Sequence, residues 1–394
     1  MNIVLFDTTA RTTLYPFTAI RPVAEIRAGI LTNRERWELL LQSNSYTLTE
    51  GYLQDKYPFV QADDFLLINA ALIPSLELVQ SVRNLALERG ITQNGIVLAV
   101  RTANRLSFGF TADDCKNVSF AEWKNKEQLI QYPFELVRFS EKNSKADFDL
   151  ITRNKSSQPV SSTNHVIDPE AIFIEEGAVV EHCFLNASAG PVYIGKDCLV
   201  MEGSMIRGPF AALEKSVVKL GSKIYGATTV GRQCTVGGEI KNSIFFDYSN
   251  KAHDGYIGDA VIGEWCNVGA GASCSNIKNT AGEVKIWNPH LHQWISAGNK
   301  CGVMLGDYTK VAINSSLTTG MVSGICSNIV TEGLSPKYIA DFTWNIKTGE
   351  KYMFDKATRD IENWMYLKNK FITDADRKIL QHIYNQKPKT TDHA

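Results

Sequence analysis

The chain has 394 residues, which is enough for two or three domains and a large core. Hydrophobic residues make up 44% and charged residues 21%, and the net charge of -1 gives no electrostatic reason to expect nucleic acid or an anionic membrane as partner. No apolar run is long enough for a membrane span, and no basic segment precedes an apolar one at the N-terminus, so neither a transmembrane helix nor a signal peptide is expected.

The cysteines are expected to be small buried side chains. The chain has eight, they are scattered, and none forms a CxxC pair. Single scattered cysteines are typical of proteins from a reducing compartment. The sequence therefore favours a cytoplasmic location.

Residues 1–155 favour an α/β domain. The apolar runs 2–6, 65–73 and 95–100 predict buried strands. One helix is predicted to begin at a capping-box sequence, Thr32 to Glu35, and another is predicted over 79–90, ending at Gly90. Alternating strands and helices predict a Rossmann-like domain with a largely parallel sheet. The chain turns polar over 141–165, where we expect the linker.

A six-residue repeat dominates residues 156–335. Six is a multiple of the strand period of two and not of the helical period of 3.6, so each hexapeptide is a short strand followed by a tight corner. Three hexapeptides close one triangular coil with the aliphatic side chains inside, which predicts a parallel β-helix. The competing interpretation is an antiparallel β-sandwich with chance spacing. The aliphatic residues at this spacing include Ile194, Val200 and Ile206, then Val218, Ile224, Val230 and Val236, then Ile262 and Val268, then Leu305, Val311 and Leu317.

The repeat is interrupted once, at 277–299. Gly282 predicts a hairpin turn in this insertion, and Trp287 and Trp294 indicate that it packs against another part of the protein. After the repeat, residues 336–394 are predicted to form short helices.

The C-terminal helix prediction depends on Thr373. This residue is spaced to cap a helix whose apolar side chains share one face. The final residues, 387–394, are polar and are expected to fray.

The stretch from Gly238 to Asn276 carries a specific resemblance. It contains GGEIKNS, KAHDGYIGD and VGAGASCSN, and it resembles the acetyltransferase domain of the bifunctional N-acetylglucosamine-1-phosphate uridyltransferase/glucosamine-1-phosphate acetyltransferase family. The whole chain is arranged similarly and looks closest to a divergent bacterial and archaeal branch. The resemblance implies a nucleotidyltransferase-like N-terminal domain, a left-handed β-helix, and a homotrimer with active sites between neighbouring β-helices. Flat outer faces agree with a three-fold assembly.

The resemblance implies roles for individual residues. His253 stands where the family keeps its catalytic base. Lys241 and Tyr256 match residues that hold the sugar phosphate, and Lys300 matches a basic residue near the substrate.

Further positions match contacts to the sugar and the acetyl donor. Asn267 and Asn276 match asparagines that position these two groups, and Ala270 matches a backbone contact to the thioester of acetyl-CoA. The arginine that completes the family's phosphate site has two candidate replacements, Lys223 and Arg207.

Elementary chemistry supports these roles. Acetyl transfer from a thioester to an amine needs a base, and a histidine with a pKa near ~6.5 can accept the proton. A backbone N–H in a glycine-rich corner can stabilise the oxyanion, and a lysine can pair with phosphate. Asp254 or a backbone carbonyl can fix the tautomer of His253. The alternative interpretation is that each residue is an ordinary wall, corner or surface residue, and it is their combined spacing that favours a site.

The N-terminal loop keeps only part of the nucleotidyltransferase pattern. The family loop resembles GGxGTRLxPLTxxxPKP, and residues 7–27 keep the second half as LYPFT but lack the glycines. At 69–72, NAAL places alanine where the metal ligand belongs. Because hard divalent cations need oxygen ligands, this loss favours weak or absent nucleotidyl transfer.

Two interpretations of this domain follow. An active, rewired enzyme would use Arg11, Arg21 and Arg27 on phosphates and Asp7 as a ligand for Mg²⁺. Otherwise the domain retains only the fold, as a nucleotide-binding or scaffold domain.

These patterns predict an acetyl-CoA-dependent N-acetyltransferase acting on an amino sugar 1-phosphate, with glucosamine 1-phosphate as the expected acceptor. The first alternative is a bifunctional enzyme that also makes UDP-N-acetylglucosamine from UTP and N-acetylglucosamine 1-phosphate. The second alternative is a non-catalytic trimeric scaffold that binds sugar nucleotides, for which His253 would be incidental.

Overall fold

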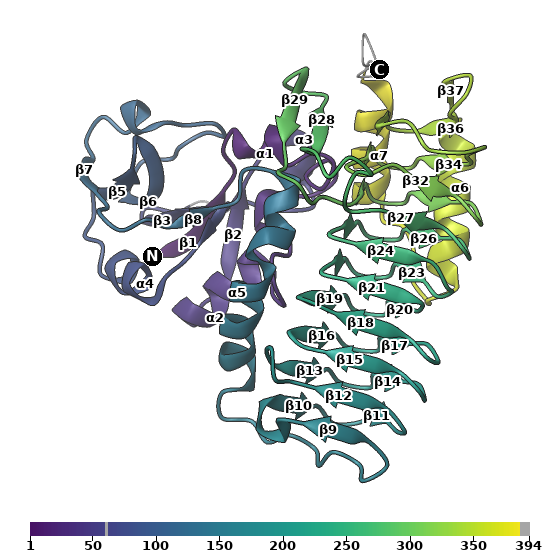
Figure 1. The fold of residues 1–394 in the computed structure, drawn as a ribbon. Helices are drawn as coiled ribbons and strands as arrows, with labels where there is room; N and C mark the ends of the chain where they lie inside the picture. The colour runs from purple at the N-terminus through teal and green to yellow at the C-terminus, as the bar shows by residue number, and fades with distance from the viewer. Residues whose placement is uncertain (60–61, 387–394) are drawn as a thin grey trace.

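The computed structural model describes residues 1–59 and 62–386, and it places an α/β domain beside a tall column of stacked coils (Figure 1). The α/β domain and the long helix α5 lie along one side of the column, and the C-terminal helices lie against its upper part on the other side. Within the described ranges no helix combines the length and the apolarity needed to cross a membrane.

The α/β domain is built on a six-stranded mixed sheet in the order β2-β1-β3-β6-β5-β7. β1 runs parallel to β2 and β3, β5 runs parallel to β7, and β6 is antiparallel to both of its neighbours. The α/β prediction is confirmed, and the sheet is more mixed than expected. Its strands are β1 (Asn2–Phe6), β2 (Ser45–Leu48), β3 (Phe65–Asn69), β5 (Arg89–Gln93), β6 (Ile96–Thr102) and β7 (Ser119–Glu122), with a small separate pair of β4 (Leu72–Ile73) and β8 (Gln128–Leu129).

The helices of this domain differ from the sequence expectation in two places. The capping box is present: the Thr32 hydroxyl accepts from the Glu35 N–H, and the Glu35 carboxylate accepts from the Thr32 N–H. The helix predicted over 79–90 ends earlier, and Gly90 lies in β5, where the Phe120 ring fills the space of a side chain. The helices are α1 (Ala10–Thr13), α2 (Asn33–Leu41), α3 (Gly51–Gln54), α4 (Leu76–Arg83) and α5 (Pro133–Thr152), with 3₁₀ turns at Val23–Glu25 and Ala112–Asp114.

The first half of the polar stretch 141–165 is helical, because α5 extends to Thr152, and the expected linker lies in its second half. Three polar residues of the helical half, Asn143, Ser144 and Asp147, are buried. The Asp147 carboxylate accepts hydrogen bonds from the Arg36 guanidinium and from the backbone N–H groups of Ile30 and Leu31. The connection between the domains is therefore confined to the residues between α5 and the first coil.

Residues from His165 onward form a parallel β-helix with three long sheets, which confirms the predicted fold class. We name the sheets by what covers them. The covered face meets the α/β domain and contains β10 (Ile172–Ile174), β13 (Val192–Ile194), β16 (Phe210–Ala212), β19 (Thr228–Val230), β22 (Ile244–Phe245), β25 (Val261–Ile262), β30 (Met304–Leu305), β33 (Val322–Ser323) and β35 (Tyr338–Ile339).

The second sheet, the helix face, meets the C-terminal helices along its upper coils. It contains β11 (Val179–Val180), β14 (Leu199–Val200), β17 (Val217–Val218), β20 (Thr235–Val236), β23 (Asn250–Lys251), β26 (Asn267–Val268), β31 (Lys310–Val311) and β34 (Asn328–Ile329). The third sheet, the open face, contains β9 (His165–Ile167), β12 (Phe184–Asn186), β15 (Met205–Arg207), β18 (Lys223–Tyr225), β21 (Glu239–Lys241), β24 (Tyr256–Gly258), β27 (Ser273–Cys274) and β32 (Ser316–Leu317).

The insertion at 277–299 forms an antiparallel hairpin of β28 (Lys285–Asn288) and β29 (Gln293–Ser296). The turn follows Asn288, so Gly282 does not make it and instead lies before the first strand. The two tryptophan rings pack together with centroids 5.3 Å apart. The Asn288 amide donates to the carbonyls of Thr12 and Thr13, so the hairpin rests on the α/β domain, as Figure 1 shows.

The C-terminal helices begin later than expected. β35 still belongs to the covered face, and a hairpin of β36 (Thr343–Asn345) and β37 (Glu350–Lys351) follows it before α6 (Phe354–Tyr366) and α7 (Asp374–Asn385). The Thr373 cap is present, since its hydroxyl accepts from the Asp376 N–H at 3.1 Å. The segment 387–394, predicted to fray, lies outside the described residues. All eight cysteines are buried and unpaired, as predicted.

Candidate active site

His253 lies in the corner that joins β23 on the helix face to β24 on the open face, and its side chain is exposed. The corner above it contains Ala270, and the two are linked because the Gly271 N–H donates to the Asp254 carbonyl at 2.9 Å. Below it, Gly238 has a φ of +74°, and a Cβ there would lie 2.8 Å from the His253 carbonyl oxygen. Glycine at this position therefore lets the His253 corner sit directly on the coil beneath.

Tyr256 follows this corner directly on the open face, and Lys241 projects from the same face at the far end of the adjacent strand β21. Successive residues of a strand point to opposite sides, and the neighbouring Ile240 and Ile257 are fully buried inside the column. Lys241 and Tyr256 therefore point outward. They lie on adjacent strands, because Glu239 pairs with Tyr256 in the register of β21 and β24.

Tyr225 is a further member of this cluster that the sequence interpretation missed. It pairs with Lys241 in register, and the Lys241 ammonium lies 5.6 Å from the centre of its ring. Its hydroxyl donates to Glu239 Oε1 at 2.7 Å, and this hydrogen bond and burial raise its pKa to about 12. The sequence signal was available, since Ile224 and Ile240 occupy equivalent inward positions and place their neighbours side by side.

The phenol of Tyr256 also stays protonated. Burial is the main cause of its raised pKa, and the nearby Tyr225, Asp259 and Glu239 add to it. The Tyr225 proton is already donated to Glu239, so the neutral phenol of Tyr256 is the available hydrogen-bond donor beside the positive charge of Lys241, which is a suitable pair for a phosphate.

Both candidate replacements for the family's arginine also lie on the open face. Lys223 and Arg207 line one groove of about 540 Å³ together with Phe184, Met205 and Tyr225. Lys223 pairs with Glu239 in register and shares β18 with Tyr225, so it is next to the Lys241 cluster. This position favours Lys223 over Arg207 as the additional phosphate ligand.

Asn267 lies on a different face from Lys241 and Tyr256. It is in β26 on the helix face, where it pairs with Asn250 below and Lys310 above. The Lys310 ammonium lies 4.7 Å from the Trp364 ring of α6. Within one chain, Asn267 therefore faces the C-terminal helices rather than the open face.

The remaining two predicted contacts are not gathered with the cluster. Asn276 is only 7% exposed, and its amide donates to the Asp259 carboxylate, which also accepts from Asn242. Lys300 is exposed on the loop that follows the inserted hairpin. Asn276 thus has a structural partner in this chain.

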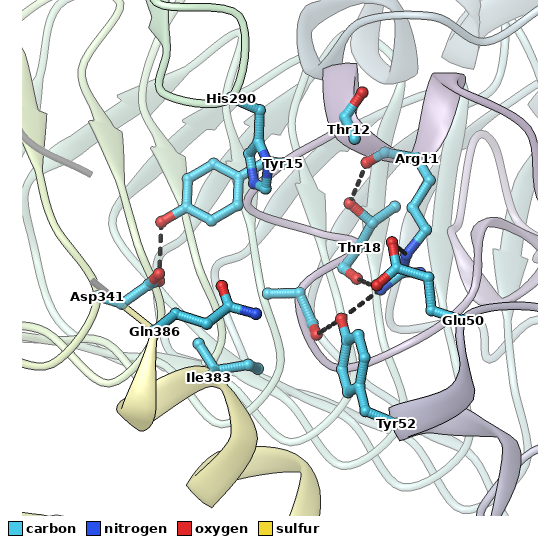
Figure 2. A pocket seen from close by; sticks show the side chains of 11 residues that line it. Arg11, Thr12, Tyr15, Thr18, Glu50, Tyr52, His290, Asp341, Ile383 and Gln386 are labelled. Atoms are coloured by element: carbon cyan, nitrogen blue, oxygen red, sulfur yellow. Dashed lines mark hydrogen bonds and ion pairs between the residues drawn. The ribbon is translucent and has the colours of Figure 1, made fainter. Parts of the chain in front are cut away.

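The predicted phosphate ligands of the α/β domain are engaged in internal contacts. Arg11 is buried and bonds to Asp7 at 3.2 Å, to Glu50 at 3.0 Å and to the carbonyls of Thr18 and Arg21. Figure 2 shows Arg11 enclosed by Thr18, Glu50 and Tyr52, beside a cavity of only about 50 Å³.

Arg21 and Arg27 connect the two domains. Arg21 pairs with Asp307 at 2.9 Å and with Glu264 at 3.0 Å, both on the β-helix. Arg27 bonds to the Ile30 carbonyl and lies 3.5 Å from Asp247 of the β-helix. These ion pairs give the loop a structural role and do not favour nucleotide binding by its arginines.

Asp7 does not fit a magnesium site. Its carboxylate accepts from the Val23 N–H at 2.9 Å, from Arg11 and from the Thr49 hydroxyl at 2.6 Å. Burial raises its pKa, although these partners oppose the shift. Across the described ranges, no group of three or more His, Cys, Asp or Glu side chains is arranged to hold a metal ion.

A separate hollow of about 300 Å³ opens where β1 and β3 end. Its wall includes Thr8, Thr9, Asn69 and Gln131 and carries no Lys, Arg, Asp or Glu side chain of the described residues. Ligands of open α/β sheets bind at this edge. The position fits a small polar ligand, but the charges for triphosphate chemistry are not in its wall.

Comparisons with known proteins agree with both domains. Residues 3–156 match a family model described as sugar nucleotidyl transferase. The chain is 24% identical over 198 residues to the bifunctional protein GlmU of Cyanothece sp. (strain PCC 7425 / ATCC 29141), covering 45% of this chain and 40% of that protein. It is 26% identical over 267 residues to the GlmU protein of Trichormus variabilis, covering 63% and 54%.

A solved structure also matches, although too weakly to support an argument. The polySia specific acetyltransferase NeuO is 13% identical with a TM-score of 0.17, over 47% of this chain and 77% of that chain. The chain spans only about two fifths or less of the length of the first relatives it matches, at 40%, 27% and 37%. The chain is thus similar to sugar nucleotidyl transferases over residues 3–156 and to GlmU proteins over part of their length.

Proposed function

We propose that the protein is an acetyl-CoA-dependent N-acetyltransferase that acts on an amino sugar 1-phosphate, with glucosamine 1-phosphate as the first substrate to test. One observation carries the proposal: the exposed imidazole of His253 lies at a glycine-bounded corner that leads directly into β24, whose Tyr256 points outward on the same face as Lys241 and Tyr225. The sequence similarity to GlmU proteins supports the same class of transferase.

In this mechanism the amine nitrogen attacks the carbonyl carbon of the thioester. The new C–N bond forms, the imidazole of His253 takes the proton lost from nitrogen, and the C–S bond then breaks to release the thiolate of coenzyme A, which takes up a proton. A backbone N–H of the corner at Ala270, stacked above His253, is the proposed donor to the oxyanion.

The sugar phosphate is assigned to the open face. Lys241 and Lys223 supply positive charge, and the phenol of Tyr256 supplies a neutral donor. A charge-assisted hydrogen bond is about twice as strong as a neutral one, so the lysines are expected to dominate binding.

We also propose a homotrimer built through the open face. The covered face packs against the α/β domain, whereas the open face carries Ile167, Phe184 and Met205 with 53%, 46% and 51% of their surfaces exposed. Exposed apolar side chains that follow one sheet are typical of an interface. In such an assembly Lys300 is assigned to a neighbouring subunit's site. The eight unpaired thiols support a cytoplasmic location.

The test is acetyl-CoA-dependent N-acetylation of glucosamine 1-phosphate by the wild type and by His253→Ala. His182→Ala is a matched control, because His182 is also exposed in a corner between the helix face and the open face, several coils below. We expect the first variant to lose at least about 100-fold in kcat and the control to keep wild-type activity. Equal rates for His253→Ala and wild type would refute the role of His253, and a wild type inactive on all amino sugar phosphates would favour the scaffold.

A second candidate activity is nucleotidyl transfer, which the match of residues 3–156 favours. It would use the hollow at the ends of β1 and β3 to convert UTP and N-acetylglucosamine 1-phosphate into UDP-N-acetylglucosamine. Pyrophosphate release that depends on UTP and Mg²⁺ tests it. Because Asp7 does not fit the metal, we expect no release above background.

A further inference from the structure

A lysine occupies the interior of the coil that carries His253. Lys251 is only 1% exposed and is among the largest fully buried side chains of the protein. It pairs in register with Val236, and the other inward positions of the helix face hold Val180, Val200, Val218, Val236, Val268, Val311 and Ile329. A lysine thus replaces valine in one coil of the stack. Burying its charge lowers the free energy of unfolding, so packing alone does not explain why a lysine is present.

The corners of other coils show what this lysine replaces. In three corners between the helix face and the open face, the last residue is a buried serine whose hydroxyl donates to a carbonyl within the same corner. Ser204 donates to Met201 at 2.7 Å, Ser222 donates to Lys219, and Ser315 donates to Ala312 at 2.9 Å. These hydroxyls satisfy buried carbonyls and fix the shape of the corner.

The His253 corner cannot use a serine. The equivalent position is Gly255, which has a φ of +121°, and a Cβ built there would lie 2.2 Å from the Ala272 carbonyl oxygen. No side chain fits between these stacked corners. The Lys251 ammonium instead donates from inside the column to the carbonyl oxygen of His253 itself.

We propose that Lys251 is a positioning residue that holds the backbone of His253 so that its imidazole is directed at the acceptor amine. This inference rests on the proposed acetyl transfer. The ammonium bonds to the residue that carries the base and does not itself contact substrate. The hydrogen bond from Lys251 to the His253 carbonyl takes the place of the serine hydrogen bond in the other corners, because no side chain fits at Gly255.

The electrostatic environment of Lys251 indicates that this buried ammonium lowers the free energy of unfolding. Burial lowers the pKa of Lys251 to about 8, and Asp254, on the same corner, opposes the shift. A buried cation without a close carboxylate destabilises the fold. Replacement by an apolar side chain is therefore expected to leave stability unchanged or raise it, while a purely structural contact would lower stability on removal.

The experiment compares Lys251→Met with wild type in steady-state acetyl transfer and in thermal unfolding. We expect kcat to fall about tenfold or more, KM for acetyl-CoA and glucosamine 1-phosphate to change by less than about twofold, and Tm to stay equal or rise. Lys251→Val, which restores the residue of the neighbouring coils, is the second variant if the methionine protein does not fold. Ser204→Ala is the matched control, because it removes a corner hydrogen bond from a lower coil that carries neither His253 nor the proposed phosphate ligands.

A readout independent of activity is amide hydrogen exchange. Lys251→Met is expected to speed exchange in the peptide covering 252–256 and not in the peptide covering 312–315. An active wild type with an equally active Lys251→Met, or unchanged exchange at 252–256, overturns the inference. An inactive wild type overturns the proposed function instead, so the two failures are distinguishable.

Discussion

Arg21 of the α/β domain lies 2.9 Å from Asp307 of the β-helix, and both side chains are almost completely buried. The same guanidinium reaches Glu264 at 3.0 Å. In a loop that resembles a phosphate-binding loop in sequence, Arg21 thus forms ion pairs with carboxylates of the neighbouring domain. This buried ion pair joins the two domains and makes Arg21 a poor candidate for a nucleotide contact.

Removing Arg21 is expected to weaken the whole protein. Arg21→Ala leaves the buried Asp307 carboxylate and the partly exposed Glu264 carboxylate without their cation, at a cost of about 3–5 kcal/mol in the free energy of unfolding. Urea unfolding measures the loss. Arg101→Ala is the control, since Arg101 pairs with Asp64 near the surface and is expected to cost no more than about 1 kcal/mol. Similar losses in both variants would contradict the interdomain role.

Glu35 is expected to make stability depend on acid pH. Burial opposes ionisation, but Arg27 and Arg232 outweigh it and lower the pKa of Glu35 to about 2, against an ordinary value of 4.5. Because the folded-state pKa lies below the unfolded one, this stabilisation is complete above about pH 4.5 and is lost as the pH falls towards 2.

The comparison that isolates this effect is Glu35→Gln against Glu141→Gln, an exposed glutamate of α5. The Glu35 variant is expected to be less stable than wild type at pH 7 by up to about 3 kcal/mol, with the difference shrinking as the pH falls below 4.5. A difference that stays constant down to pH 2 would show that Glu35 acts through packing and not through charge.

Lys241 is expected to govern the affinity for the sugar phosphate. Lys241→Met should raise KM for glucosamine 1-phosphate about tenfold or more, because the phosphate loses a charge-assisted partner, and should leave KM for acetyl-CoA near its wild-type value. Lys215→Met serves as control, as Lys215 lies on an exposed corner and pairs with Glu214. A larger effect on acetyl-CoA than on the sugar would place the phosphate elsewhere.

Gly255 is expected to tolerate no side chain. Gly255→Ala combines a positive φ with a 2.2 Å approach to the Ala272 carbonyl, so we expect a loss of at least about 2 kcal/mol and a disturbed His253 corner. Gly221→Ala has a φ of +63° and open space around its Cβ, which isolates the backbone cost at about 1 kcal/mol. Thermal unfolding distinguishes them, and equal shifts in Tm would show that the close approach is relieved at little cost.

The parts of the fold set by local periodicity were predictable from the sequence. Ile224, Ile240 and Ile257 occupy the interior as their spacing implies, and the Thr32 and Thr373 caps start the helices that they predict. Local patterns did not show where distant contacts decide the structure. The polar stretch 141–165 does contain the connection between the domains, but its first half belongs to α5, where Asp147 is buried against Arg36.

The candidate site was predictable in part for the same reason. The open-face cluster follows from register, so Lys241 and Tyr256 come together as expected, and Tyr225 could have been added. Lys251 was not foreseen, because a lysine beside a histidine suggests a solvated surface. Only the register with Val236 shows that it points inward.

The covered face also limits how this protein can change in length over evolution. The loop that contains Arg21 and Gly29 contacts the column at two different coils. The Thr229 hydroxyl donates to the Gly29 carbonyl at 2.9 Å, and Arg21 forms an ion pair with Asp307 several coils higher. Duplicating or deleting a coil between Thr229 and Asp307 would move one of these residues too far from the loop to keep its contact. Gain or loss of coils is therefore expected below Thr229, near the first coils, and not between Thr229 and Asp307.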